Sequence, residues 1–220
     1  MPNWCDCELS LRGKNVKECV EAIQGEPGKD DDGYKLDFNK IVPMPAILEG
    51  TVAGYPADAG LALLDDEKGL EMLSSYCVQR QGITDLDGLR KHIRELPAAA
   101  EYEKAGKHAL QAKEETGYYN WHDWCDGTTE KAFQDGHWGT KWNACYCTKS
   151  EKSETSTTIG FLSAWSPPSP VVKELAKQYP HLTITLRYWE GGVGFRGTLV
   201  AKGNRTLKDA TYEYSGPRGG

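Results

Sequence analysis

The chain has 220 residues and a mass of 24.4 kDa, which leaves room for one domain with an insertion but hardly for two full domains. Charged residues make up 26% and hydrophobic residues 39% of it, a balance that is typical of globular proteins and excludes a disordered chain. The net charge of −6 argues against a general phosphate-binding protein. No apolar run reaches the ~18 residues of a membrane span, and the first residues lack the features of a secretory signal, so we expect a cytoplasmic protein that does not enter the membrane.

The first predicted element is a strand at residues 4–11, where apolar and polar residues alternate as on a strand that is covered on one face. A helix follows, with Asn15 as its expected cap and Glu18 in the reciprocal position of a capping box. The chain then predicts a polar loop at residues 26–33 and an extended stretch at residues 34–42.

Residues 49–117 are expected to be mainly helical. Their leucines recur at helical spacing, and the segment from Ala98 to Lys113 is rich in alanine, glutamate and lysine, which are strong helix formers. Gly82 and Pro97 separate the predicted helices.

Strands return in the last third of the chain. Alternation predicts strands at residues 142–148 and 157–165, joined by a charged hairpin turn or loop at residues 149–156. Ser169 is the expected cap of a second helix, with Pro170 at its first position.

Three more strands are predicted at residues 182–189, 195–201 and 210–214. Residues 191–194 are glycine-rich, but they join two strands and do not open a helix. We therefore expect a hairpin turn there and not a phosphate-binding loop.

Without the inserted region, the predicted order is strand, helix, strand, strand, helix, strand. This is the order of a ferredoxin-like α+β fold, in which two helices pack on one face of an antiparallel sheet and the opposite face needs another cover or must tolerate water. We expect a discontinuous sheet domain at residues 1–48 and 138–215, a mainly helical insertion at residues 49–137 and a flexible tail at residues 216–220.

Four short sequence motifs of unusual composition occur in order along the chain. They are Pro2–Cys5, Phe38–Pro45, Trp138–Asn143 and Ala164–Pro168. With them the sequence resembles the YubB-like family of bacteriophage and plasmid proteins, and residues 120–124 resemble a further segment of that family. The resemblance implies a ferredoxin-like domain and a mobile-element setting, and therefore the cytoplasm of a bacterial host cell; it supplies no catalytic residues.

Seven cysteines without an export signal indicate reduced thiols. The pairs Cys5/Cys7 and Cys145/Cys147 have the residue types of a four-thiolate zinc site. The usual ferredoxin-like order places a strand between the two pairs, so they would lie roughly 10 Å apart, whereas zinc keeps sulfurs within about 4 Å of each other. We expect core packing of these cysteines, and neither a metal nor a cofactor.

Residues 121–137 gather an acid, imidazoles and a thiol. An enzyme would use Cys125 as nucleophile with His122 or His137 as its base, and a metal site would use His122, Asp123 and His137. Neither spacing matches a known mechanism, so we favour a surface loop and a protein that is not an enzyme.

Five of the seven tryptophans lie near the junction between the insertion and the sheet. They either wedge the helices against the sheet or present anchors to a partner, because tryptophan is enriched at binding hot spots. With the neighbouring lysine, the candidate binding residues are Trp121, Trp124, Trp138, Lys141, Trp142 and Trp165.

The leading functional hypothesis is a non-catalytic accessory protein of a phage or other mobile element that binds and modulates a host or bacterial defence protein, for example as an anti-CRISPR-type inhibitor. One alternative is a protein that sequesters a nucleotide or small molecule beside Trp138, Lys141 and Trp142, and another is an enzyme that uses the thiol–imidazole segment. Nucleic acid ranks below protein as a partner because these motifs lack interleaved basic residues. The oligomeric state stays open.

Overall fold

The computed structural model describes residues 3–26, 33–126 and 137–216. Most of the predicted polar loop at residues 26–33 lies outside the described residues, as do residues 127–136 and all of the predicted tail except Gly216.

The chain divides into two compact units. We call the first, Met1–Pro43 with Cys125–Gly220, the sheet unit, and the second, Met44–Trp124, the helical unit. Among the described residues, no helix combines the length and apolar character that crossing a membrane requires.

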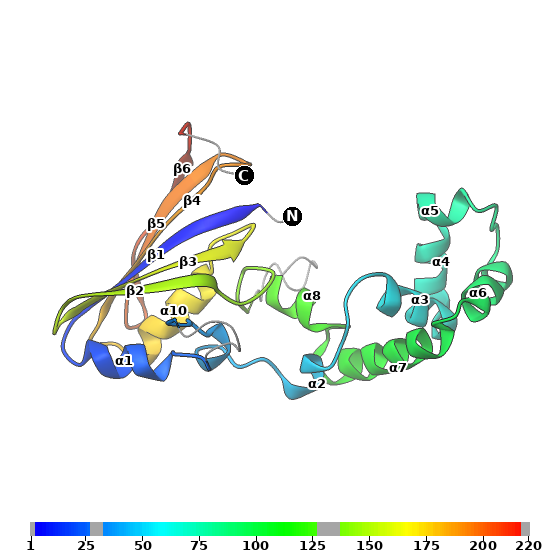
Figure 1. The fold of residues 1–220 in the computed structure, drawn as a ribbon, viewed down its shortest axis with the longest axis horizontal. Coiled ribbons are helices and arrows are strands. Elements are labelled where there is room, and N and C mark those ends of the chain that lie inside the picture. The colour runs from blue at the N-terminus through cyan, green and yellow to red at the C-terminus, as the bar shows by residue number, and fades with distance from the viewer. Residues whose placement is uncertain (1–2, 27–32, 127–136, 217–220) are drawn as a thin grey trace. The chain divides into compact units, whose positions relative to one another are not determined.

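The sheet unit contains a six-stranded antiparallel sheet with the order β2-β3-β1-β4-β5-β6. Helices α1 (Val16–Ala22) and α10 (Ser169–Gln178) lie on the same face of it (Figure 1). The first four strands and these two helices follow each other as in a ferredoxin-like fold, which confirms the predicted α+β class. The strands are β1 (Trp4–Arg12), β2 (Cys145–Ser153), β3 (Ser156–Ala164), β4 (Thr183–Glu190), β5 (Phe195–Lys202) and β6 (Arg205–Glu213).

The core of the sheet unit lies between the sheet and these two helices. Cys7 of β1 pairs with Phe161 of β3 and Tyr188 of β4, and all three side chains are buried. The helices contribute the stripes that helical spacing predicts, including Cys19 of α1 and Leu175 of α10, both fully buried.

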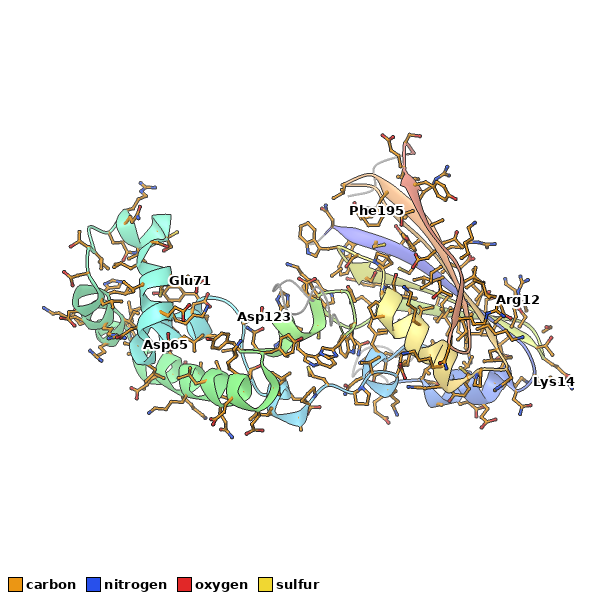
Figure 2. The ribbon with its side chains drawn as sticks, turned by 180° about the vertical axis from the view of Figure 1, so that it is seen from behind. Arg12, Lys14, Asp65, Glu71, Asp123 and Phe195 are labelled. Carbon is orange, nitrogen blue, oxygen red and sulfur yellow. The ribbon has the colours of Figure 1, made fainter. Side chains whose placement is uncertain are left out.

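The other residues of each strand point to the opposite side of the sheet, which we call the open face. Trp189 of β4 is 40% exposed there and Tyr212 of β6 is 55% exposed, so this face is in contact with water. Arg12 and Phe195 mark opposite ends of the sheet (Figure 2).

The capping box predicted for α1 is wrong. Asn15 precedes the helix with a left-handed backbone (φ 59°), and its side chain makes no capping hydrogen bond. Asparagine tolerates this conformation better than most residues, so it serves here as a turn residue between β1 and α1.

The extended stretch predicted at residues 34–42 is also largely wrong. It is reduced to one isolated bridge between Gln24 and Leu36, after which the short 3-10 helix η1 (Phe38–Lys40) begins. The Asp37 carboxylate accepts a hydrogen bond from the first turn of η1 and stabilises it.

The hairpin connection predicted at residues 149–156 is confirmed, but its turn is much shorter than predicted. β2 continues to Ser153, residues 154–155 form the turn, and β3 begins at Ser156. Because β2 is an edge strand exposed on both faces over its last residues, it shows no apolar alternation there. The hairpin predicted at residues 191–194 is confirmed, since it joins β4 to β5.

The second predicted helix is shifted by one residue at its start. Pro168 occupies the capping position of α10, and Ser169 is already the first helical residue without a capping hydrogen bond.

The helical unit is built from short helices around one long helix. They are α2 (Ala46–Glu49), α3 (Tyr55–Leu64), α4 (Asp66–Leu73), α5 (Tyr76–Gln79), α6 (Leu86–Glu95) and α7 (Ala99–Thr116), and α8 (Trp121–Asp126) begins in this unit. Alanines of α3 and the buried Leu89 and Ile93 of α6 form its apolar core.

Two glycines let α3 and α7 cross closely. A Cβ atom at Gly60 would overlap the backbone oxygen of Tyr102, and one at Gly106 would overlap the backbone of Gly60. The crossing therefore depends on the absence of side chains at both positions.

We expect Gly60→Ala to push α3 and α7 apart and to destabilise the helical unit by about 1–3 kcal/mol. Chemical denaturation followed by far-UV circular dichroism measures this. Gly88→Ala in α6 is the control, because its Cβ would meet side-chain atoms and no backbone, the Asp85 carboxylate at 3.2 Å and the Ile83 methyl group at 3.8 Å, and alanine favours helix. Equal midpoints for Gly60→Ala and the wild type would contradict the role of the crossing.

Candidate functional site

Two of the candidate tryptophans are buried. Trp124 is 3% and Trp138 4% exposed. The Trp138 indole donates its Nε1 hydrogen to the Val42 carbonyl (2.9 Å) and packs edge to face on Phe38 at 5.8 Å. Trp138 therefore belongs to the core of the sheet unit and presents no surface to a partner.

Trp121 lies in the helical unit. Its backbone N–H donates to the Thr51 hydroxyl (2.9 Å), and its half-buried ring stands 5.3 Å from the His122 ring.

Of the other three candidates, Lys141 and Trp165 contact each other, and Trp142 contacts Trp4, which the sequence did not single out and which in turn contacts Tyr146. The Lys141 ammonium lies 5.4 Å from the centre of the Trp165 ring. The Trp142 ring is 6.2 Å from Trp4, whose ring is in turn 6.0 Å from Tyr146. We call these five residues the aromatic corner; they lie at the end of the sheet where β1 begins and β3 ends.

Two residues of the aromatic corner have strained backbones. Tyr146 has φ 50° and Trp165 has φ 69°, both in the left-handed region that costs about 1–2 kcal/mol for a residue with a side chain. The same two side chains are 75% and 41% exposed. A register shift between Cys145 and Thr148 accounts for the bulge that places Tyr146 in this conformation.

The Trp-Gly-Thr-Lys-Trp-Asn motif at residues 138–143 contains both structural and surface residues. The buried Thr140 hydroxyl donates to the Ala164 carbonyl (2.9 Å) and accepts from the Ala164 N–H (3.1 Å). These two hydrogen bonds fix the motif to the end of β3. Gly139 has φ 71° and no room for a Cβ beside Pro170. Lys141 and Trp142 are left at the surface between these fixed points.

Asn143, the last residue of the motif, makes a second set of hydrogen bonds. Its side chain accepts from the Phe38 N–H (2.8 Å) and donates to the Asp37 carboxylate (2.7 Å). The motifs that contain Phe38 and Asn143 are therefore in contact, although these two residues are 105 positions apart in the chain.

The thiol of Cys125 is fully buried, and burial raises its pKa to about 12, with the neighbouring Asp126 carboxylate adding to the shift. At neutral pH the thiol is protonated and is a poor nucleophile. The Cys125 carbonyl accepts the N–H groups of Trp138 (3.3 Å) and Gly139 (3.0 Å), so this residue anchors the start of the motif.

The predicted core packing of Cys5 and Cys7 is confirmed, since both are buried. Burial also raises the pKa of the Cys7 thiol, which lies 3.4 Å from the Ser163 hydroxyl. The same prediction is wrong for Cys145 and Cys147, which are only half-buried because β2 is an edge strand, with β3 between it and β1. Within the described ranges, no group of three or more histidines, cysteines or acids is arranged to hold a metal ion.

We expect iodoacetamide to leave Cys125 unmodified in the native protein at neutral pH, because the thiol is buried and protonated. Cys77 is exposed and serves as the internal control that must react. Mass spectrometry of the alkylated peptides measures both. Modification of Cys125 at the rate of Cys77 would contradict the buried placement and favour the enzyme alternative.

The open face carries two shallow hollows, and Trp189 lines both. The first, of about 420 Å³, lies between Tyr146 and Trp189 and has Asp6 and Glu8 of β1 in its lining. Burial raises the pKa of Asp6. Neither hollow is lined by Trp138, Lys141 or Trp142, the residues beside which a nucleotide pocket was expected.

The second hollow, of about 480 Å³, differs in charge. Its lining includes Arg187, Trp189, Arg196 and Tyr212. Sequence reasoning missed this group because its members come from three strands and lie in register only in the folded sheet.

A polar cluster lies in the helical unit. The ammonium groups of Lys68 and Lys113 lie 5.1 and 4.9 Å from the centre of the Tyr119 ring. Burial raises the pKa values of Asp58 and Asp123, the latter labelled in Figure 2. The two lysine contacts link α4 and α7 to the segment between α7 and α8.

Comparison with known proteins gives a family match for part of the chain. A crystal structure of a protein Api92 from Yersinia pseudotuberculosis is similar at 14% identity with a TM-score of 0.43, and the match covers 99% of this chain and 100% of that chain. A search of curated proteins found no match. Residues 141–216, which include most of the sheet, match the family model described as "Ferredoxin-like domain in Api92-like protein".

Proposed function

We propose that this protein acts by binding and not by catalysis, as an accessory protein of a bacteriophage or plasmid that modulates a host or bacterial defence protein. The mobile-element setting is supported by the resemblance of four motifs of this sequence to the YubB-like family. The binding role is supported by the aromatic corner.

The observation that carries the proposal is the pairing of exposure with strain at Tyr146 and Trp165. A glycine or asparagine would relieve the left-handed strain at both positions, and neither ring is needed to fill the core, since both are exposed. Backbone strain of this kind collects at sites of recognition, and large aromatic side chains dominate the energetics of interfaces.

Trp4 and Trp142 support the exposed ring of Tyr146. Trp142 meets Trp4 edge to face and Trp4 meets Tyr146 in the same way, so the Tyr146 ring is held in place before a partner arrives. A surface that is already ordered loses less entropy on binding. Lys141 beside Trp165 adds a cation to the corner, which favours a partner surface with an apolar pocket edged by carboxylates.

The double variant Tyr146→Asn/Trp165→Asn tests the proposal. Asparagine accepts the left-handed backbone, so we expect the variant to be at least as stable as the wild type while losing its partner. Quantitative mass spectrometry of proteins recovered from bacterial lysate on immobilised protein should show a roughly tenfold loss of the partner, about 1.4 kcal/mol in binding.

Val193→Asn is the matched control, because Val193 is an apolar residue of the same unit that is 73% exposed and lies in the β4–β5 turn. It should recover the partner as the wild type does. Equal recovery by the double variant, or no protein enriched by the wild type, would contradict the proposed function.

A further inference from the structure

We propose that the open face of β4, β5 and β6 binds a single strand of nucleic acid. This surface uses none of the residues of the aromatic corner, so the inference goes beyond the proposed function and stands or fails separately.

Cations gather on this face although the chain is acidic. Arg196 and Lys202 of β5 alternate with the buried Leu199 and Ala201, so they point away from the helices. The cationic residues that register and alternation place on the open face of these strands are Arg187, Arg196, Lys202, Arg205 and Lys208.

The three carboxylates of the same described strands, Glu190, Asp209 and Glu213, occupy positions of the opposite, helix-covered face. Glu190 is buried and accepts the N–H groups of Gly192 (2.7 Å) and Val193 (2.5 Å) in the turn. Asp209 binds Lys173 of α10 (3.0 Å), on the helix-covered side. On the neighbouring β1, Glu8 lies 3.2 Å from Arg187 and Asp6 pairs with Trp189, so these two acids lie along one border of the basic area.

The aromatic residues stand in register with one of these cations. Arg196 pairs with Trp189 on one side and with Tyr212 on the other. Adjacent strands lie about 4.8 Å apart, which places the two aromatic positions roughly 10 Å from each other with the arginine between them. All three line the 480 Å³ hollow.

This order of aromatic, cation and aromatic suits an unpaired strand. Bases of a single strand stack on exposed aromatic rings, and the phosphates between them contact arginine and lysine. A duplex hides the faces of its bases and cannot stack in this way. From Arg196 to Lys202 the strand rises about 20 Å, which is long enough for the cations to follow several phosphates.

An acidic protein segment would satisfy the cations but would leave Trp189 and Tyr212 without a specific role. The in-register aromatic pair therefore favours nucleic acid. The overall charge of −6 repels a polyanion at long range, so we expect weak, strongly salt-dependent binding.

The test is fluorescence anisotropy of the full chain with a labelled single strand of about 12 nucleotides, DNA and RNA in parallel. The charge variant is Arg196→Glu/Lys208→Glu, and the stacking variant is Trp189→Ala/Tyr212→Ala. Lys14→Glu/Lys17→Glu is the matched control, because it changes the charge equally at exposed positions before and within α1.

We expect the charge variant to bind roughly tenfold more weakly and to lose about 0.7 from the salt slope for each phosphate contact removed. The stacking variant should weaken binding with the salt slope unchanged, and the control should bind as the wild type does.

Four outcomes would overturn the inference. They are no binding at about 50 mM salt, tighter binding of the duplex of the same sequence, equal weakening by the α1 control, and full competition by a polyglutamate peptide or by a mononucleotide at equal phosphate or carboxylate concentration. A polyglutamate result would assign the surface to an acidic protein instead.

Discussion

The position of β1 in the middle of the sheet determines the rest of the sheet unit. It is hydrogen-bonded to β3 on one side and to β4 on the other. The alternation of apolar and polar residues along β1 therefore determines which face of these three strands is buried. Cys7 meets Phe161 and Tyr188 beneath the helices. A slip of one residue would move these side chains into water, and it would bury Asp6 and Glu8 without partners.

The fold could be predicted from the sequence where one face of an element is buried and the other is wet. This holds for β1, whose alternate residues from Cys5 to Leu11 are all buried, and for the stripes of α1 and α10. It fails where long-range contacts determine the backbone. The stretch around Phe38 bends into η1 beside Asn143, which is 105 positions away, and the last part of β2 is a strand only because β3 pairs with it.

The candidate surfaces could be predicted only in part for the same reason. The unusual sequence motifs contain Lys141, Trp142 and Trp165. Tyr146, however, is exposed through a bulge that depends on the pairing of β2 with β3. The basic area of the open face is hidden in an acidic chain because its cations are separated by buried residues and by other strands. Only the register brings Trp189, Arg196 and Tyr212 into one row.

The central claim is that one face of the sheet is uncovered and carries the aromatic residues that bind. Hydroxyl-radical footprinting of the full chain, read by mass spectrometry, tests it most directly because oxidation rates follow side-chain exposure. The account predicts rapid oxidation of Trp189 and Tyr212 and slow oxidation of Trp138, which is buried in the same unit. Protection of Trp189 and Tyr212 to the level of Trp138 would contradict it, because the open face would then be covered within the chain itself.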